Sequence, residues 1–178
     1  IMAINFPEGW QNYPANIVKM STYTLANTSN NAWTSIPEGV QSITISFEEV
    51  STYNNPAAFY VQIGDNVSGF LTSGYTGTWI HENPSGTAGG REQDAGFEIY
   101  QSGSSYYSTG HAHLSLQDTS SSHYWVCSIL AGQQHSPHVA HGAGYKILSG
   151  SNRYLDRVRF SIASGVWDAG SVSLHYSF

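Results

Sequence analysis

Residues 155–178 alternate between apolar and polar side chains, and this alternation constrains the fold more than any other feature of the chain. Valine, phenylalanine and isoleucine alternate with arginine and serine over residues 157–162, and a second run of the same kind covers residues 171–178. Successive side chains of a β-strand point to opposite faces, so a period of two predicts a strand with one buried face. A glycine-containing turn separates the two runs, and the pattern therefore predicts a β-hairpin at the end of the sequence.

The rest of the chain is also typical of a β protein. No stretch shows the 3.6-residue period of an amphipathic helix. Many short strands separated by turn residues are typical of sandwiches and jelly rolls. The sequence predicts an all-β protein with a single antiparallel β-sandwich or jelly-roll-like domain over residues 16–178, after a leader over residues 1–15. Besides the terminal pair, strands are predicted at residues 17–25, 39–50, 59–63, 97–100, 112–116, 124–130 and 145–148.

The composition excludes several classes of protein. Charged residues make up 10% of the chain and the formal net charge is −6, which argues against binding to the phosphates of nucleic acid. No apolar run is long enough to insert into a membrane as a spanning helix. The single cysteine, Cys127, excludes an intrachain disulfide and is expected to pack in the core. Trp33, Trp125 and Trp167 lie in or beside predicted strands and are assigned to the core as well.

Six short motifs occur in a fixed order along the chain. They are I-P-E-G-V (36–40), V-Q-I-G-D (61–65), T-S-G-Y (72–75), A-G-F (95–97), L-D-R-V-R (155–159) and W-D-A-G-S-V (167–172). Each motif is short, but the ordered set resembles the C-terminal domain of tail-fibre proteins from tailed bacteriophages and prophages. The resemblance covers residues 16–178.

This resemblance implies a receptor-binding tip at the distal end of a tail fibre in the virion. It also implies a homotrimer that recognises a bacterial surface component during host attachment, with a polysaccharide as the expected receptor. Residues 1–15 are then a leader or the end of the fibre shaft. Two other functions stay open, namely an adhesin that binds an outer-membrane protein and a structural cap for trimerisation. No ligand residue is carried over from the family, because receptor choice is expected to lie in the loops of such fibres.

A glycan hydrolase is the least favoured function. Such an enzyme needs two carboxylates that face one pocket about 5–9 Å apart. Glu48 and Glu49 are adjacent on a predicted strand and are expected to point to opposite faces. The sequence also lacks a G-x-S-x-G elbow, a phosphate-binding glycine loop and a D-x-D-x-D-G calcium loop. We therefore expect no catalytic residue and no cofactor.

Histidines are concentrated between residues 111 and 141. His111 and His113 share one face of a predicted strand and are weak metal candidates, because two ligands without a partner chain are too few for a site. No metal site is expected. His135, His138 and His141 follow at a spacing of three in a predicted loop over residues 131–144, where they are candidates for contact with a ligand or a neighbouring subunit.

Aromatic residues in polar, glycine-rich surroundings are the stronger functional signal. A second long connection, residues 68–94, contains Trp79 and His81, and Tyr106 and Tyr107 follow it. Long loops of compact domains are commonly functional. Flat aromatic rings suit the apolar C–H faces of sugars, and tyrosine and tryptophan add a hydrogen-bonding edge. The predicted ligand-binding residues are Trp79, His81, Tyr106, Tyr107, His135, His138 and His141.

Overall fold

The computed structural model describes residues 17–53, 57–86, 88–99, 106–118, 122–134, 138–149 and 153–178. These residues form β-strands and no helix, which confirms the predicted all-β class. The leader predicted over residues 1–15 lies outside the described residues. No helix long and apolar enough to cross a membrane occurs in the described part of the chain.

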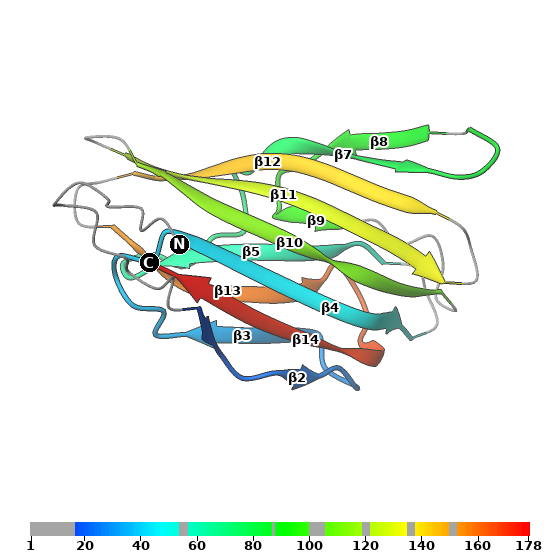
Figure 1. Ribbon diagram of the computed structural model, residues 1–178, viewed down its shortest axis with the longest axis horizontal. Helices are drawn as coiled ribbons and strands as arrows, with labels where there is room; N and C mark the ends of the chain where they lie inside the picture. The colour runs from blue at the N-terminus through cyan, green and yellow to red at the C-terminus, as the bar shows by residue number, and fades with distance from the viewer. Residues whose placement is uncertain are drawn as a thin grey trace, which may run out of the picture.

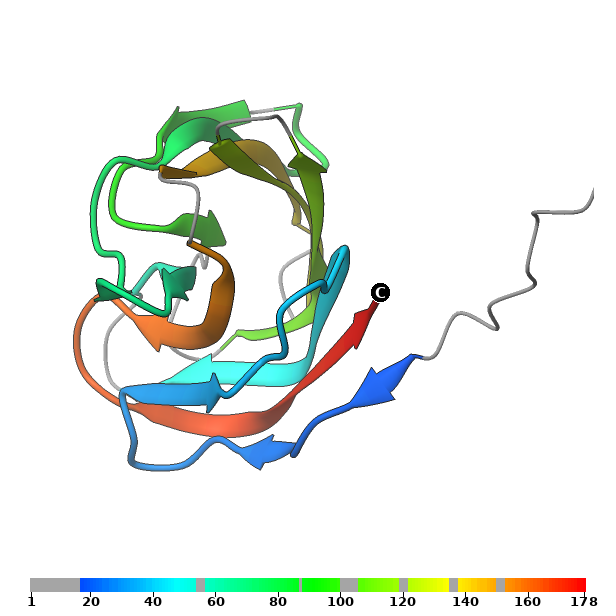
Figure 2. The ribbon, with the colours of Figure 1, turned by 90° about the vertical axis from the view of Figure 1, so that its left-hand side faces the viewer.

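Two antiparallel sheets pack face to face as a β-sandwich (Figure 1). The larger sheet has nine strands and curves around the smaller one, which closes its open side (Figure 2). Its strands in spatial order are β1 (Val18–Lys19), β14 (Trp167–Ser177), β4 (Ser42–Thr52), β10 (Tyr107–Asp118), β11 (Ser122–Gln134), β12 (Val139–Ser149), β7 (Thr76–Glu82) and β8 (Ala88–Glu92), with β2 (Tyr23–Thr24) also paired to β14. The smaller sheet contains β3 (Asn30–Thr34), β13 (Leu155–Ile162), β5 (Phe59–Asp65) and β6 (Gly69–Phe70), with β9 (Phe97–Ile99) paired to β5.

The last two strands depart from the expected topology. β13 pairs with β3 and β5, whereas β14 pairs with β4, β1 and β2. The two strands therefore lie in opposite sheets, and the predicted terminal hairpin is wrong. Alternation reveals that each strand has one buried face. It does not distinguish two strands of one hairpin from two strands that bury their faces against one core from opposite sides.

Both predicted long loops contain strands. Residues 68–94 include β6, β7 and β8, and residues 131–144 consist largely of the ends of β11 and β12. Several of the glycines that suggested turns, among them Gly77, Gly90 and Gly144, occupy strand positions where a Cβ atom has no room. A Cβ atom on Gly77, for example, would lie 2.5 Å from the carbonyl oxygen of Ala143 on the neighbouring strand.

Aromatic rings from both sheets form the centre of the core. Phe160 of β13 stacks on Trp167 of β14, with ring centroids 5.0 Å apart, and Phe47 of β4 lies 5.7 Å from Phe160. Phe59 of β5 completes the cluster, 4.9 Å from Trp167. These pairs join strands of opposite sheets, so they hold the sandwich together. The expected core positions of Trp33, Trp125, Trp167 and Cys127 are confirmed, since all four side chains are at most 2% exposed.

Candidate functional site

Three of the predicted ligand residues lie together on and beside β7, the strand next to the edge strand β8 of the large sheet. Trp79 and His81 alternate with exposed residues on β7, and their ring centroids are 5.6 Å apart. The ring of His138, which precedes β12, lies 6.0 Å from that of His81. Trp79 is only 6% exposed, so its indole offers little surface to a ligand. Ligand contact by these residues stays a prediction.

Two glycines make the space for these rings. Gly89 lies opposite His81 on β8, and a Cβ atom there would overlap the His81 ring. Gly142 lies opposite Trp79 on β12, and a Cβ atom there would approach the Trp79 Cβ to 3.1 Å. The packing of a ring over a facing glycine depends on strand register, so the sequence alone offered no signal for it.

Tyr107 is at the start of β10, opposite Gln134, and Tyr106 precedes it. Next to Gln134, the Gln133 N–H donates to the His138 carbonyl oxygen (3.0 Å). Tyr107 therefore lies at the same end of the large sheet as His138. His135 lies outside the described residues.

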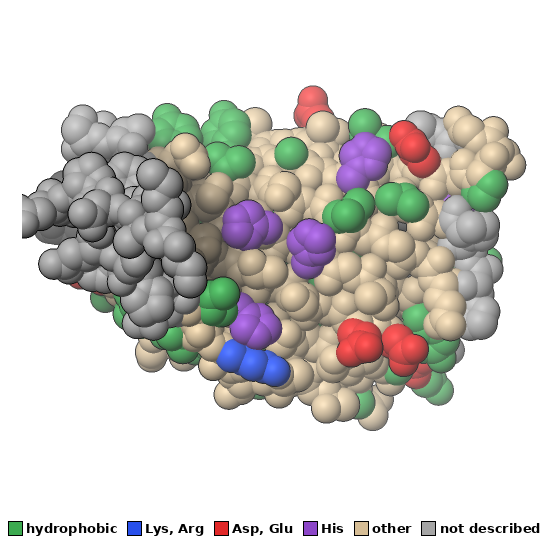
Figure 3. Space-filling model, viewed as in Figure 1, with side chains coloured by type: hydrophobic (Ala, Val, Ile, Leu, Met, Phe, Trp, Pro, Cys, Tyr) green, Lys and Arg blue, Asp and Glu red, His purple; other side chains and the backbone are tan. Residues whose placement is uncertain are grey.

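The other predicted histidines lie on the outer face of the large sheet, the face that points away from the small sheet. His111 and His113 both point to this side of β10, as expected, and His113 Nδ1 is 3.0 Å from Thr44 Oγ1. His141 lies on β12 rather than in a loop, separated from His111 by Leu130. Figure 3 shows the histidines spread across this face. No group of three or more potential metal ligands occurs in the described part of the chain.

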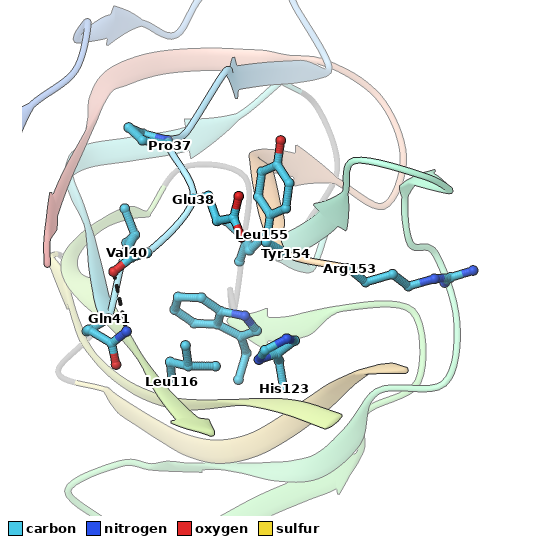
Figure 4. Close-up of a pocket in the computed structure, with 11 residues that line it drawn as sticks. Pro37, Glu38, Val40, Gln41, Leu116, His123, Arg153, Tyr154 and Leu155 are labelled. Carbon is cyan, nitrogen blue, oxygen red and sulfur yellow. Dashed lines mark hydrogen bonds between the residues drawn. The ribbon is translucent and has the colours of Figure 1, made fainter. Parts of the chain in front are cut away.

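A small pocket at one end of the sandwich was not predicted from the sequence (Figure 4). Its volume is about 250 Å³. It lies between the β3–β4 connection and the facing ends of β10, β11 and β13. The residues that line it are Pro37, Glu38, Gly39, Val40, Gln41, Leu116, His123, Trp125, Arg153, Tyr154 and Leu155.

Backbone hydrogen bonds hold the loop that carries Glu38. At one end, the Ile36 N–H donates to the Asp156 carbonyl oxygen of β13 (2.9 Å). At the other end, the Gln41 N–H donates to the Ser177 carbonyl oxygen, and the Leu116 N–H donates to the Gln41 carbonyl oxygen, both at 2.8 Å. Gly39 has a φ of 91°, a left-handed value that favours glycine, and this turn follows Glu38 directly. The carboxylate is therefore carried by a loop that is fixed on both sides.

The pocket combines an aromatic and aliphatic wall with a few polar groups. Trp125, only 2% exposed, lines the pocket together with Leu116 and Leu155. In Figure 4 the side chains of Glu38 and Tyr154 lie close together at the pocket, and His123 lies on the opposite side. Such a setting suits a ligand with both apolar faces and hydroxyl groups.

Arg153 supports the pocket without directing its charge into it. Its side chain points away from the pocket in Figure 4, and Nη1 pairs with Asp65 Oδ2 at 3.2 Å. Asp65 is fully buried and also accepts the N–H groups of Val67 and Ser68, so its charge is compensated from three sides. The motif V-Q-I-G-D thus ends on a residue that anchors β13 next to the pocket.

The comparisons with known proteins found no match. No family model, no curated protein and no solved structure matches the chain.

Proposed function

We propose that this chain is the receptor-binding tip of a bacteriophage tail fibre, placed at the distal end of the fibre in the virion. In this proposal it forms a homotrimer and binds a bacterial surface polysaccharide during host attachment, without chemical turnover. The ordered sequence motifs support the family, and the end pocket is the observation that carries the binding function.

The size and lining of the pocket suit one sugar unit. Its volume of about 250 Å³ is below the range of roughly 300–1,000 Å³ that is typical for drug-sized ligands. A single ring therefore fits better than an extended molecule. The half-buried Tyr154 ring suits the C–H face of a sugar, and its hydroxyl both donates and accepts hydrogen bonds, while Glu38 accepts them from hydroxyl groups.

The carboxylates favour binding over hydrolysis. Among the described residues that line the pocket, Glu38 is the one carboxylate. A glycosidase requires a second one at about 5–9 Å. Glu48 and Glu49 are both exposed because a bulge with a φ of 51° at Glu49 turns them out of the alternation, and neither lines this pocket. A single sugar site is expected to be weak, and three linked copies raise the effective concentration of the other sites once one is occupied.

The proposal is tested by staining a panel of bacterial strains with the fluorescently labelled protein, before and after periodate oxidation of the cells. We expect strain-selective staining that is lost on oxidation. Glu38→Gln is expected to weaken binding about tenfold, since a hydrogen bond to a charged group contributes about 1.5–3 kcal/mol. Glu48→Gln, an exposed glutamate outside the pocket, is the matched control and is expected to stain like the wild type.

Other outcomes identify the alternatives. Selective staining that survives periodate would contradict a glycan receptor and favour an adhesin for an outer-membrane protein. Equal staining by the Glu38 and Glu48 variants would remove the end pocket from the binding site. The same assay on a variant with alanine at Tyr106 and Tyr107 then tests the aromatic pair, and wild-type staining would exclude it.

A structural cap for trimerisation is the second candidate. It is favoured by the apolar surface on the outer face of the large sheet, where five large hydrophobic side chains are exposed: Ile80, Val126, Leu130, Val139 and Tyr145. We call these five residues the outer patch.

A further inference from the structure

The outer patch is unusual because it concentrates the exposed hydrophobic surface of the chain. Nine large hydrophobic residues are exposed in the described part of the chain, and five of them belong to the outer patch. All five lie on three adjacent strands, β7, β11 and β12. Single exposed apolar residues are ordinary, whereas their concentration on one face of a sheet indicates an interaction surface.

Strand register places the outer patch on one face of three adjacent strands, with His141 and the row Ser128, Ala143 and Thr78 between its members. Leu130 of β11 lies next to His141 of β12, and His141 lies next to Ile80 of β7. Two rows along, Val126 is paired with Tyr145. The ring of Tyr124, on the same side of β11 as Val126, lies 5.9 Å from that of Tyr145 and extends the apolar surface toward the end of the sheet.

Charge distinguishes this face from the other outer surface of the sandwich. The outward positions of β11 and β12, both fully described, carry no Asp, Glu, Lys or Arg. Acidic groups lie toward the right-hand and upper margins of the face in Figure 3. The small sheet, in contrast, carries Asp156, Arg157 and Arg159 on the partly exposed positions of β13.

The absence of charge favours a second copy of this chain as the partner. Two copies with a net charge of −6 repel each other, and they approach at the lowest cost through β11 and β12, whose outward positions carry no carboxylate. The exposed Glu82 of β7 is paired with Val139 at one end of the outer patch. A sugar bound here would bury hydroxyl groups that need hydrogen-bond partners. The aliphatic side chains of Ile80, Leu130 and Val139 offer none. An apolar surface of the same kind has no such requirement.

The face is also large enough for stable association. Four strands spaced about 4.8 Å apart and about 30 Å long give a face of roughly 600 Å². Stable protein interfaces bury about 600–1,000 Å² on each partner. The strands β7, β10, β11 and β12 are neighbours in the sheet and provide this area.

We propose that the outer patch is the contact surface between copies of this chain. The inference rests on the homotrimer of the proposed function and names the face that the copies share. It makes no demand on the end pocket, which is lined by other residues.

The test measures the mass of the full chain by light scattering and sedimentation velocity at concentrations from about 1 to 100 μM. We expect the wild type to have a multiple of the 19.4 kDa chain mass, and Leu130→Lys to reduce it two- to threefold, to that of one chain. Val67→Lys is the matched control, because Val67 is 64% exposed in the turn between β5 and β6. This control is expected to keep the wild-type mass.

Circular dichroism and thermal melting establish that the variants are folded, and Val126→Lys provides a second variant of the outer patch. A monomeric wild type at 100 μM would overturn the proposal. So would an oligomer that survives both lysine substitutions, or one that Val67→Lys also dissociates.

Glycan binding is measured on the same variants. A monomeric Leu130→Lys that still binds periodate-sensitive receptor at lower avidity supports both proposals. An oligomer that binds no glycan contradicts the proposed receptor while leaving the interface intact.

Discussion

At the scale of single residues, Gly77 and Gly144 show how closely the strands of the large sheet approach each other. The two glycines are paired across β7 and β12, and Gln93 Oε1 lies against both of them. A Cβ atom on Gly77 would lie 2.5 Å from the Ala143 carbonyl oxygen, 2.6 Å from the Gly144 Cα and 2.9 Å from Gln93 Oε1. The first two neighbours are backbone atoms and are unable to move aside separately from their strand.

Gly77→Ala is therefore expected to lower the free energy of unfolding by about 2–3 kcal/mol, the cost of overpacking a rigid site. Gly132→Ala on β11 is the control, because among the described residues no atom lies within 4 Å of its added Cβ. We expect it to change stability by no more than about 0.5 kcal/mol, or to increase it slightly by restricting the unfolded chain. Urea denaturation measures both variants, and equal effects would contradict the steric explanation.

The residue scale also shows what the sequence could and could not reveal about the sites. Trp125 and Cys127 were assigned to the core correctly, because large or thiol side chains in an alternating run are seldom exposed. The end pocket was missed because Glu38 and Tyr154 are more than a hundred residues apart in the chain and meet only through pairing of distant segments. The spacing of residues along the sequence does not indicate such a contact.

At the scale of elements, one hydroxyl group closes a gap along the edge of β5. The pairing of β9 with β5 ends at Val61, and the pairing of β6 begins at Gly64. Between them the Ile63 N–H donates to the Tyr75 hydroxyl at 2.8 Å, and that hydroxyl donates to the Leu71 carbonyl oxygen at 3.0 Å. Tyr75 directly precedes β7, so the same side chain ties the large sheet to the small one.

Tyr75→Phe is expected to destabilise the protein by about 1–3 kcal/mol, the cost of leaving a buried N–H group without a partner. The Tyr75 ring is retained in this variant, so its edge contact with Phe97, at a centroid distance of 4.9 Å, should persist. Tyr53→Phe removes the hydroxyl of a side chain that is 55% exposed and is expected to have almost no effect. Thermal melting of the two variants checks the difference, and unchanged melting of Tyr75→Phe would show that the hydroxyl contributes nothing.

The element scale is where prediction from sequence was least complete. The alternating pattern correctly located the buried faces of β4, β5, β13 and β14. It wrongly predicted that β13 and β14 pair with each other, whereas they lie in different sheets. Strands β7, β11 and β12 continue through Gly, Gln and His residues that resemble a loop when read locally. Backbone hydrogen bonds to the neighbouring strands on each side hold these residues in strand conformation, and such tertiary pairing is not visible in the local sequence.

At the scale of the whole molecule, two buried ionisable groups lower the free energy of unfolding at alkaline pH. Desolvation by burial raises the pKa of the Tyr75 hydroxyl and of the fully buried Cys127 thiol. In the unfolded chain a thiol ionises near about pH 8.5 and a phenol near about pH 10. Above these values the unfolded state binds fewer protons than the folded state, so stability falls as pH rises. Below about pH 8 both groups are protonated in both states, and their contribution is constant.

We expect the wild type to lose about 3–3.5 kcal/mol of unfolding free energy between pH 8 and pH 10.5, since each group contributes about 1.4 kcal/mol per pH unit above its unfolded pKa. Cys127 accounts for most of this loss because its thiol ionises first in the unfolded chain. Cys127→Ala lowers stability at pH 8 by removing core contacts, but its stability should then decline by less than about 1 kcal/mol up to pH 10.5. Tyr75→Phe should follow the wild type up to about pH 10 and decline less steeply above it. Urea denaturation at a series of pH values measures these slopes, and parallel curves for all three proteins would mean that the folded core admits the charged forms.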